Sequence, residues 1–222
     1  MAELLALEGV TLVAPDGRKV FEDLTWRLEA GARAVFREGL GNGASALLRV
    51  CAGLVRPSSG RVLLEGVPLD SEGPTHPFVA AGRLGWVPTD GGLAANLTLL
   101  DNAALPLRFA RNVPREEAAA DATRWLERAG LVRALGHRPA VPADRDAWLA
   151  SLARAATKGS TLWLVDRPAG GLDAGSRAAA RAILEEVGRD PAVTLVLVGG
   201  EWLAGLGVPL RIEDGRIVEG GS

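Results

Sequence analysis

The sequence predicts an α/β fold, with a sheet core that is interrupted by a helical insertion. Three observations lead to this class. Short apolar segments that are typical of buried strands alternate with helical segments in both ends of the chain. Two segments near the N-terminus alternate apolar and polar residues, as half-buried antiparallel strands do. From about Thr98 to Leu152 apolar residues recur at spacings of three and four, which indicates helices.

The first part of the chain predicts a hairpin followed by a strand–loop–helix unit. Leu4–Leu12 and Val20–Leu28 predict two antiparallel strands joined by a turn at Pro15-Asp16-Gly17. The apolar segment Ala34–Phe36 predicts a strand that runs into a glycine-rich loop, and Ala44–Ala52 predicts the next helix. A turn at Ser58-Ser59-Gly60 and strands at Arg61–Glu65 and Leu84–Pro88 follow.

The second part of the chain predicts helices first and then a return to alternating strands and helices. Pro114, just before Arg115-Glu116-Glu117, fits the start of a helix. Helices are predicted at Ala103–Arg111, Arg115–Ala129, Ala147–Ala156 and Ala174–Val187, and strands at Thr161–Val165, Val193–Val198, Leu210–Glu213 and Arg216–Val218.

Composition restricts the classes of protein and partner. The chain has 222 residues, 48% of them hydrophobic, which is enough for the core of one domain. A net charge of −2 offers no general basic field for nucleic acid, so we expect no nucleic-acid partner. The N-terminus shows no signal-peptide pattern, and no apolar run reaches the roughly 18 residues of a membrane span. We therefore expect a cytoplasmic protein or the peripheral subunit of a larger assembly.

The glycine-rich loop resembles a phosphate-binding loop without its lysine. A P-loop reads G-x-x-x-x-G-K-[ST], because its backbone amides cradle phosphate and its lysine adds a positive charge. With the last glycine of that motif placed at Gly43, Ala44 takes the lysine position and Glu38 the first glycine position. Only Ser45, at the usual Mg²⁺-ligand position, is retained. Taken alone, the loop also fits a plain strand-to-helix turn.

Three longer stretches resemble the nucleotide-binding subunit of ABC transporters. They are LLRVCAGLVRPSSGRVLLEGVPL (47–69), LWLVDRPAGGLD (162–173) and DGRIVEGGS (214–222). A fourth, DGGLAANLTLLDNAALPLRF (90–109), is most similar to the Mla-type, lipid-trafficking members. The resemblance implies a P-loop NTPase (RecA-like) core with an antiparallel β-subdomain and a helical subdomain. It implies one domain over 1–222, with core and β-subdomain in 1–97 and 158–222 and the helical subdomain in about 98–157.

Most residues that carry the family's chemistry are replaced. The adenine-stacking aromatic should fall near Ala14, and the Q-loop glutamine aligns with Thr89. The LSGGQ signature falls on Pro142–Asp146, a segment without glycine or serine. The Walker B aspartate is retained as Asp166, and Asp173 of the D-loop remains. The catalytic glutamate is replaced by Arg167, and the switch histidine by Gly200.

Each replacement removes a separate physical contribution to catalysis. Without the lysine, charge that develops on the phosphate is not neutralised. Glu38 places a carboxylate where phosphate would approach, and at ~4 Å with an effective dielectric of ~20 that repulsion is about 4 kcal/mol. Arg167 has only donors and stays charged, so it cannot accept a proton from water as a glutamate does. Because the P-loop, glutamate and signature defects share one chain, both sites of a head-to-tail dimer would be impaired.

The resemblance therefore implies an emptied nucleotide site with no catalytic residue and no metal site. Its vestigial residues are Gly39, Gly41, Asn42, Gly43, Ala44, Ser45 and Asp166. No cofactor is expected, and ATP with Mg²⁺ would be bound only if the site is still used. The alternative is that Ser45 caps the helix start and Asp166 bonds nearby backbone amides.

Other residues that carry chemistry favour ordinary structural roles. Cys51 lies on the predicted helix after the loop, where a small core residue is expected. His76 and His137 lie in Pro/Gly-rich loops and are expected at the surface, not as metal ligands. Trp86 and Trp163 lie in predicted strands and are expected in the core. Trp148 and Trp202 fall near the expected catalytic loops, where they would either fill the volume that a nucleotide or partner subunit would occupy or form a contact face.

The leading expectation for function is an ATP-binding-subunit homologue that does not hydrolyse ATP and has a structural or regulatory role in a membrane transport complex. It would bind a multi-pass permease through the region near Thr89–Arg108, on the cytoplasmic face of the membrane. It would also act as a homodimer or pair with another ABC subunit. One alternative is a weak or unconventional ATPase that drives lipid-type transport, and another is a soluble interaction module.

Overall fold

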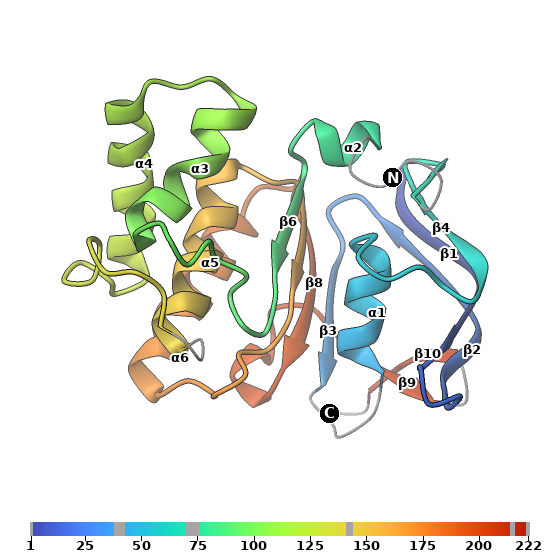
Figure 1. The fold of residues 1–222 in the computed structure, drawn as a ribbon. Helices are drawn as coiled ribbons and strands as arrows, with labels where there is room; N and C mark the ends of the chain where they lie inside the picture. Colours follow the sequence, from blue (N-terminus) through green and yellow to red (C-terminus); the bar gives the residue numbers. More distant parts are fainter. Residues whose placement is uncertain (1, 38–42, 70–75, 141–143, 214–215, 221–222) are drawn as a thin grey trace.

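The computed structural model describes residues 2–37, 43–69, 76–140, 144–213 and 216–220 and contains two sheets with flanking helices (Figure 1). The strands are β1 Glu3–Val13, β2 Lys19–Glu29, β3 Arg33–Arg37, β4 Ser59–Leu64, β5 Val67–Pro68, β6 Leu84–Val87, β7 Leu162–Val165, β8 Thr194–Gly199, β9 Val208–Glu213 and β10 Arg216–Glu219. The helices are α1 Ala44–Cys51, α2 Pro77–Ala80, α3 Leu99–Ala110, α4 Arg115–Arg128, α5 Arg145–Lys158, α6 Ala174–Val187 and the 3-10 turn η2 Glu201–Leu203. Within these residues, none of the helices has the length and apolar character needed to span a bilayer.

The larger sheet has six strands in the order β10-β9-β3-β8-β7-β6. β3 pairs parallel with β8 and with β9, and β7 pairs parallel with β8 and β6. The smaller sheet, β2-β1-β4-β5, is antiparallel. The α/β class with an antiparallel unit, which the sequence predicts, is therefore confirmed.

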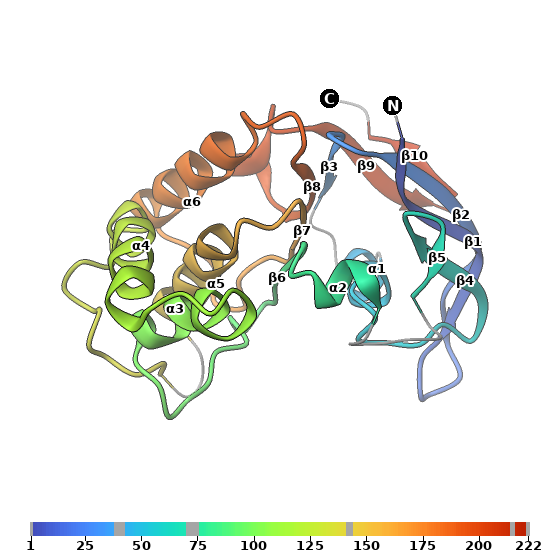
Figure 2. The same ribbon diagram turned by 90° about the horizontal axis from the view of Figure 1, so that it is seen from above.

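Two hydrophobic cores form on the two faces of the larger sheet. One joins α3, α4, α5 and α6 to the side chains that point to one face, and the other joins α1 and the smaller sheet to those on the opposite face. Strand alternation explains the division: Val35 belongs to the first core, whereas Ala34 and Phe36 belong to the second. Figures 1 and 2 show α1 between the two sheets and α3 to α6 on the far side of the larger one.

The main elements agree with the sequence predictions, and the differences are local. The hairpin, its turn and the α6 bounds are confirmed. The turn predicted at Ser58–Gly60 is partly wrong, because β4 already begins at Ser59. The sequence analysis predicts no helix or strand at α2, β5 or η2. These elements span two to four residues each and are too short to show a periodic pattern.

Two expectations about aromatic and histidine side chains need correction. His76 is buried at 1% exposure, not a surface loop residue, because it caps α2 by accepting from Phe78 N and bonds Val67 O through Nε2. Trp86 is only half-buried, although Trp163 lies in the core as predicted. His137 is exposed, in agreement with the prediction.

Candidate functional site

The candidate site lies where β3 ends and α1 begins. Gly43 precedes α1 with a φ of 78°, and a Cβ at this position would lie 3.2 Å from Val20 Cγ1, so both conformation and space favour glycine. Ala44 follows and is buried at 1% exposure, and Ser45 comes next on the helix. The other proposed loop residues, Gly39, Gly41 and Asn42, lie outside the described residues, as does Glu38.

Ser45 and Asp166 bond directly to each other. Ser45 Oγ donates to Asp166 Oδ1 at 2.8 Å, and the same oxygen accepts from the Arg167 amide at 2.9 Å. Asp166 stands directly after β7, is fully buried, and has its own amide bonded to Val87 O on β6 at 2.8 Å. Its second oxygen, Oδ2, is buried without a hydrogen-bond partner among the described residues.

The Asp166 carboxyl titrates in a mixed environment. Burial raises its pKa above the ordinary value, because a charged carboxylate loses hydration there. The Ser45 hydroxyl, the Arg167 amide and the Arg49 and Arg167 cations act in the opposite direction, and burial prevails. The site therefore disfavours a charge on Asp166, the retained Walker B aspartate.

A buried tryptophan contacts the backbone of Asp166. Trp148 of α5 is buried at 1% exposure and donates from Nε1 to Asp166 O at 2.9 Å. Trp202 of η2 is half-buried and packs edge-on against it, with ring centroids 6.4 Å apart. Burial at 1% exposure is not compatible with the contact face that the sequence left open for Trp148.

The remaining replaced positions lie at the ends of neighbouring strands. Thr89 lies beside the segment after β7, since its carbonyl accepts from Ala169 N at 2.9 Å. Arg167 is half-buried next to Asp166. Gly200 follows β8 and accepts from Leu203 N at 3.1 Å within the turn that leads into η2.

The signature segment has become an ordinary helix start. Asp144 caps α5 by accepting from Ala147 N at 3.0 Å, and Arg145 forms ion pairs with Asp146 and with Asp173. Asp173 in turn caps α6 through Ser176 N at 2.8 Å, and this bond holds the pKa of Asp173 below its ordinary value. Pro142 and Ala143 lie outside the described residues.

The described residues do not meet the requirements of Mg²⁺ and a triphosphate. Ser45 Oγ and the unpartnered Asp166 Oδ2 are suitable oxygen ligands, but Mg²⁺ needs near-octahedral oxygen coordination, and Ser45 already donates to Asp166. Ala44 offers a buried methyl group where a cation would contact phosphate. Lys158 donates from Nζ to Leu84 O at the start of β6, whereas Asp166 bonds Val87 O at the end of that strand. In this arrangement the described residues do not fit the bound nucleotide.

The loop after β6 is held by a residue that sequence reasoning missed. Arg154 of α5 donates to Gly92 O at 2.8 Å, to Gly91 O at 3.3 Å and to Ser151 Oγ at 3.1 Å. Burial lowers the pKa of its guanidinium below the ordinary value. In the sequence, an arginine between alanines in a helical pattern is expected to face solvent. The only sequence feature that could have pointed to a role for Arg154 is its position shortly after the segment that replaces the signature.

Comparisons with known proteins agree with this geometry. The model of the ABC transporter family matches residues 21–170, more than half of the chain. The chain is 30% identical to the lipoprotein-releasing system ATP-binding protein LolD of Pseudomonas syringae pv. tomato, over 92% of this chain and 91% of that protein. It is 35% identical to LolD of Geobacter metallireducens over 80% of each chain. It is 28% identical to the macrolide export ATP-binding/permease protein MacB of Rhodopirellula baltica, over 99% of this chain but 33% of that protein.

A solved structure supports the fold over the whole length. The dimeric bacterial ABC transporter cassette MJ0796 superposes with a TM-score of 0.85 at 22% identity, covering 99% of this chain and all of the other. The same cassette in a post-hydrolysis state with ADP and Pi gives a TM-score of 0.85 at 21% identity. At these identities the likeness establishes the architecture alone.

Proposed function

The chain belongs to the ABC transporter family, and from that premise we propose that it is a transport-complex subunit that does not hydrolyse ATP. As an ATP-binding-subunit homologue it acts on the inner face of the membrane, against a permease. Its contribution to that complex is structural or regulatory. The relatives described above are named for two different cargoes, lipoproteins and macrolides, so we propose no specific cargo for this chain. The resemblance to Mla-type members stays a prediction.

The observation that carries the proposal is the direct contact between Ser45 and Asp166. These are the two retained residues of the nucleotide site, and at 2.8 Å the hydroxyl bonds the carboxylate. Burial also raises the pKa of Asp166, which disfavours the anion that a divalent cation needs. Ala44 and Arg167 support the same conclusion, since one cannot neutralise phosphate and the other cannot accept a proton from water.

The proposed partner surfaces are those expected from the family resemblance. The permease would contact the region Thr89–Arg108, which includes the first part of α3, and residues 98–157 would form the helical subdomain beside it. α3, α4 and α5 pack against one another within that range. Dimerisation, with a second copy or with another ABC subunit, remains part of the proposal.

Calorimetry of Mg·ATP binding to the purified full chain tests the proposal. The natural protein is expected to show no binding up to millimolar nucleotide, while the double variant Ala44→Lys, Glu38→Gly gains measurable affinity. The single variant Glu38→Gly is the matched control, because it removes the repulsive carboxylate without restoring the lysine. Micromolar binding by the natural protein would overturn the proposal and favour the second candidate, a weak ATPase. Hydrolysis that depends on Mg²⁺ and disappears in Asp166→Ala would establish that candidate.

A further inference from the structure

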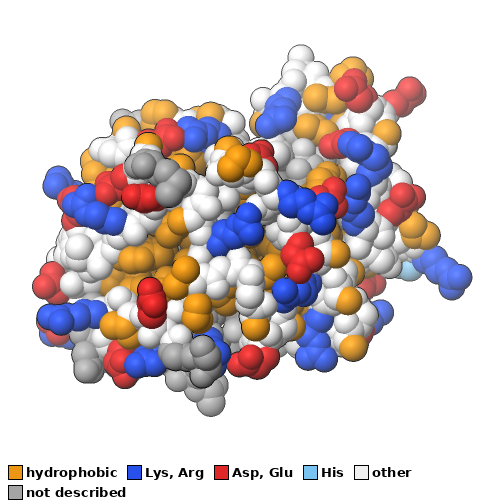
Figure 3. Space-filling model, turned by 180° about the vertical axis from the view of Figure 1, so that it is seen from behind, with side chains coloured by type: hydrophobic (Ala, Val, Ile, Leu, Met, Phe, Trp, Pro, Cys, Tyr) orange, Lys and Arg blue, Asp and Glu red, His pale blue; other side chains and the backbone are white. Residues whose placement is uncertain are grey.

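A pocket lies on the face of the larger sheet that is opposite α1. Alternation along β3 places Val35 and Arg37 on this face, whereas Ala34 and Phe36 pack in the core that contains α1. The pocket lies where the parallel strands β3 and β8 end, at Arg37 and Gly199. Carboxyl ends of parallel strands are where open α/β sheets bind ligands. Figure 3 shows the back of the molecule, where apolar side chains are exposed among charged ones.

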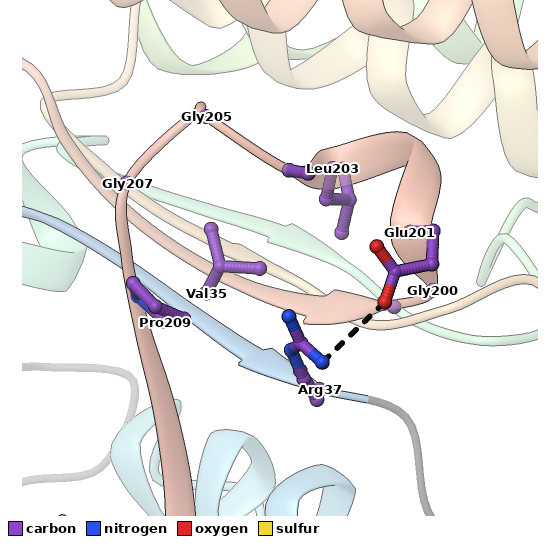
Figure 4. A pocket seen from close by; sticks show the side chains of 10 residues that line it. Val35, Arg37, Gly200, Glu201, Leu203, Gly205, Gly207 and Pro209 are labelled. Carbon is purple, nitrogen blue, oxygen red and sulfur yellow. Dashed lines mark ion pairs between the residues drawn. The ribbon is translucent and has the colours of Figure 1, made fainter. Parts of the chain in front are cut away.

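The size and lining of the pocket suit a small organic molecule. Its volume is about 520 Å³, within the range of roughly 300–1,000 Å³ that is usual for ligand sites. Val35, Leu203 and Pro209 supply apolar surface, and glycines supply much of the remaining wall. Figure 4 shows Arg37 and Glu201 joined by their ion pair, with Leu203 beside Glu201 and with Val35 and Pro209 across the cavity. The lining thus combines an apolar part with one charged corner.

The wall formed by η2 and the following loop is fixed before any ligand arrives. Arg181 of α6 donates to Trp202 O at 2.8 Å and to Ala204 O at 2.9 Å. Leu203 is buried at 1% exposure and packs closely over Gly199, where an added Cβ would lie 2.6 Å from Leu203 Cδ1. A wall held in this way does not need to be ordered on binding, which removes one cost of association.

The charged corner includes an exposed ion pair between Arg37 and Glu201, and Arg37 has a further contact in the structure. Arg37 and Glu201 approach to 3.5 Å, and their side chains are 47% and 80% exposed. Pairs of this kind contribute little to stability, so a ligand anion can displace Glu201. A guanidinium also matches a planar carboxylate through two parallel hydrogen bonds. Because Glu201 stays nearby, a singly charged anion suits this corner better than a doubly charged phosphate.

We propose that this pocket binds a small monocarboxylate with an apolar body, with the carboxylate on Arg37 and the body against Val35, Leu203 and Pro209. The pocket includes Gly200, the replaced switch position, but neither Ser45 nor Asp166 lines it. The proposal does not depend on whether the chain hydrolyses ATP.

The test uses the full chain and two probes that differ only in charge, 4-phenylbutanoate and 4-phenylbutanamide. Calorimetry should give an affinity at least about tenfold higher for the acid than for the amide, because only the acid forms a charge-assisted pair. Arg37→Gln should remove that preference, and Glu201→Gln should strengthen acid binding. Ala204→Trp, which fills the pocket from an exposed position, should weaken both probes. Arg61→Gln removes an arginine of similar exposure on β4 and should change nothing.

Three results would overturn the proposal. They are equal affinity for acid and amide, acid binding that survives Arg37→Gln, and failure of both probes to bind at millimolar concentration. In ¹H–¹⁵N spectra the acid should shift the Gly199, Gly205 and Gly207 amides. Shifts confined to other parts of the chain would count against the assigned pocket.

Discussion

Replacing Asp166 with asparagine should stabilise the fold at neutral pH. The side chain is fully buried, and its Oδ2 atom has no partner among the described residues, a situation that costs about 1–3 kcal/mol for a polar group. Asparagine retains an oxygen that accepts from Ser45 and Arg167, but its NH₂ inherits the unpartnered position. The net gain therefore comes from removing the charge, and we expect ~1 kcal/mol in the free energy of unfolding.

The pH dependence fixes the sign of this effect. Burial raises the folded-state pKa of Asp166, so the ionised carboxylate destabilises the folded chain. That penalty is absent below the unfolded-state pKa of about 3.9, grows between the unfolded-state and the folded-state pKa, and is constant above the latter. The advantage of Asp166→Asn should thus increase from acid toward neutral pH and vanish in acid.

Urea unfolding from pH 3.5 to 8 measures the difference between Asp166→Asn and the natural protein. The matched control is Asp16→Asn, a change at an exposed turn aspartate that accepts from Arg18 N and should alter stability by less than about 0.5 kcal/mol. A loss of more than about 1 kcal/mol at pH 7.5 in Asp166→Asn would refute the reasoning. It would mean that the hydrogen bonds to the carboxylate outweigh its desolvation.

Three further outcomes are expected. Trp148→Phe removes the indole hydrogen bond to Asp166 O and leaves a small void, so urea unfolding should show a loss of about 2 kcal/mol, and an unchanged midpoint would contradict the packing role. Arg154→Met keeps a long apolar side chain but leaves two loop carbonyls unpaired, so hydrogen exchange after β6 should accelerate and stability should fall by ~2 kcal/mol. Burial raises the pKa of the Cys51 thiol to about 12, so the native protein should not react with a disulfide reagent at pH 8, whereas rapid native labelling would show that the thiol is accessible.

Much of the fold could be predicted because its patterns are long. The 14 residues of Ala174–Val187 begin after an Asp cap and carry a regular apolar face, so the predicted bounds match the helix. β7 is a fully buried apolar run and is equally visible. α2, by contrast, is a single turn that depends on His76 as its cap. A four-residue helix has no period, so nothing in the sequence distinguished it from a loop.

The position of the site in the chain could be predicted from the sequence, but the contacts between its residues could not. The strand–glycine–helix order placed Ser45, and the apolar run ending in aspartate placed Asp166, on neighbouring parts of the fold. Their contact depends on how α1 lies against β7 and β8, which only tertiary packing decides. The same is true of Trp148: its position on a helix was predicted, but its bond to Asp166 O crosses between elements and has no local signature.

The Ser45–Asp166 bond also has a consequence for how the chain folds. It joins residues 121 positions apart in sequence, with two strands of the smaller sheet, β4 and β5, and the helices α3, α4 and α5 between them. Contacts at such separations form only after the long intervening segment has been closed, at an entropic cost that slows folding. β7, which precedes Asp166, pairs with β8 in the C-terminal half of the chain, whereas α1 follows β3 in the N-terminal half. The bond therefore depends on long-range assembly of the central sheet, and a probe placed at it should report a late step of folding.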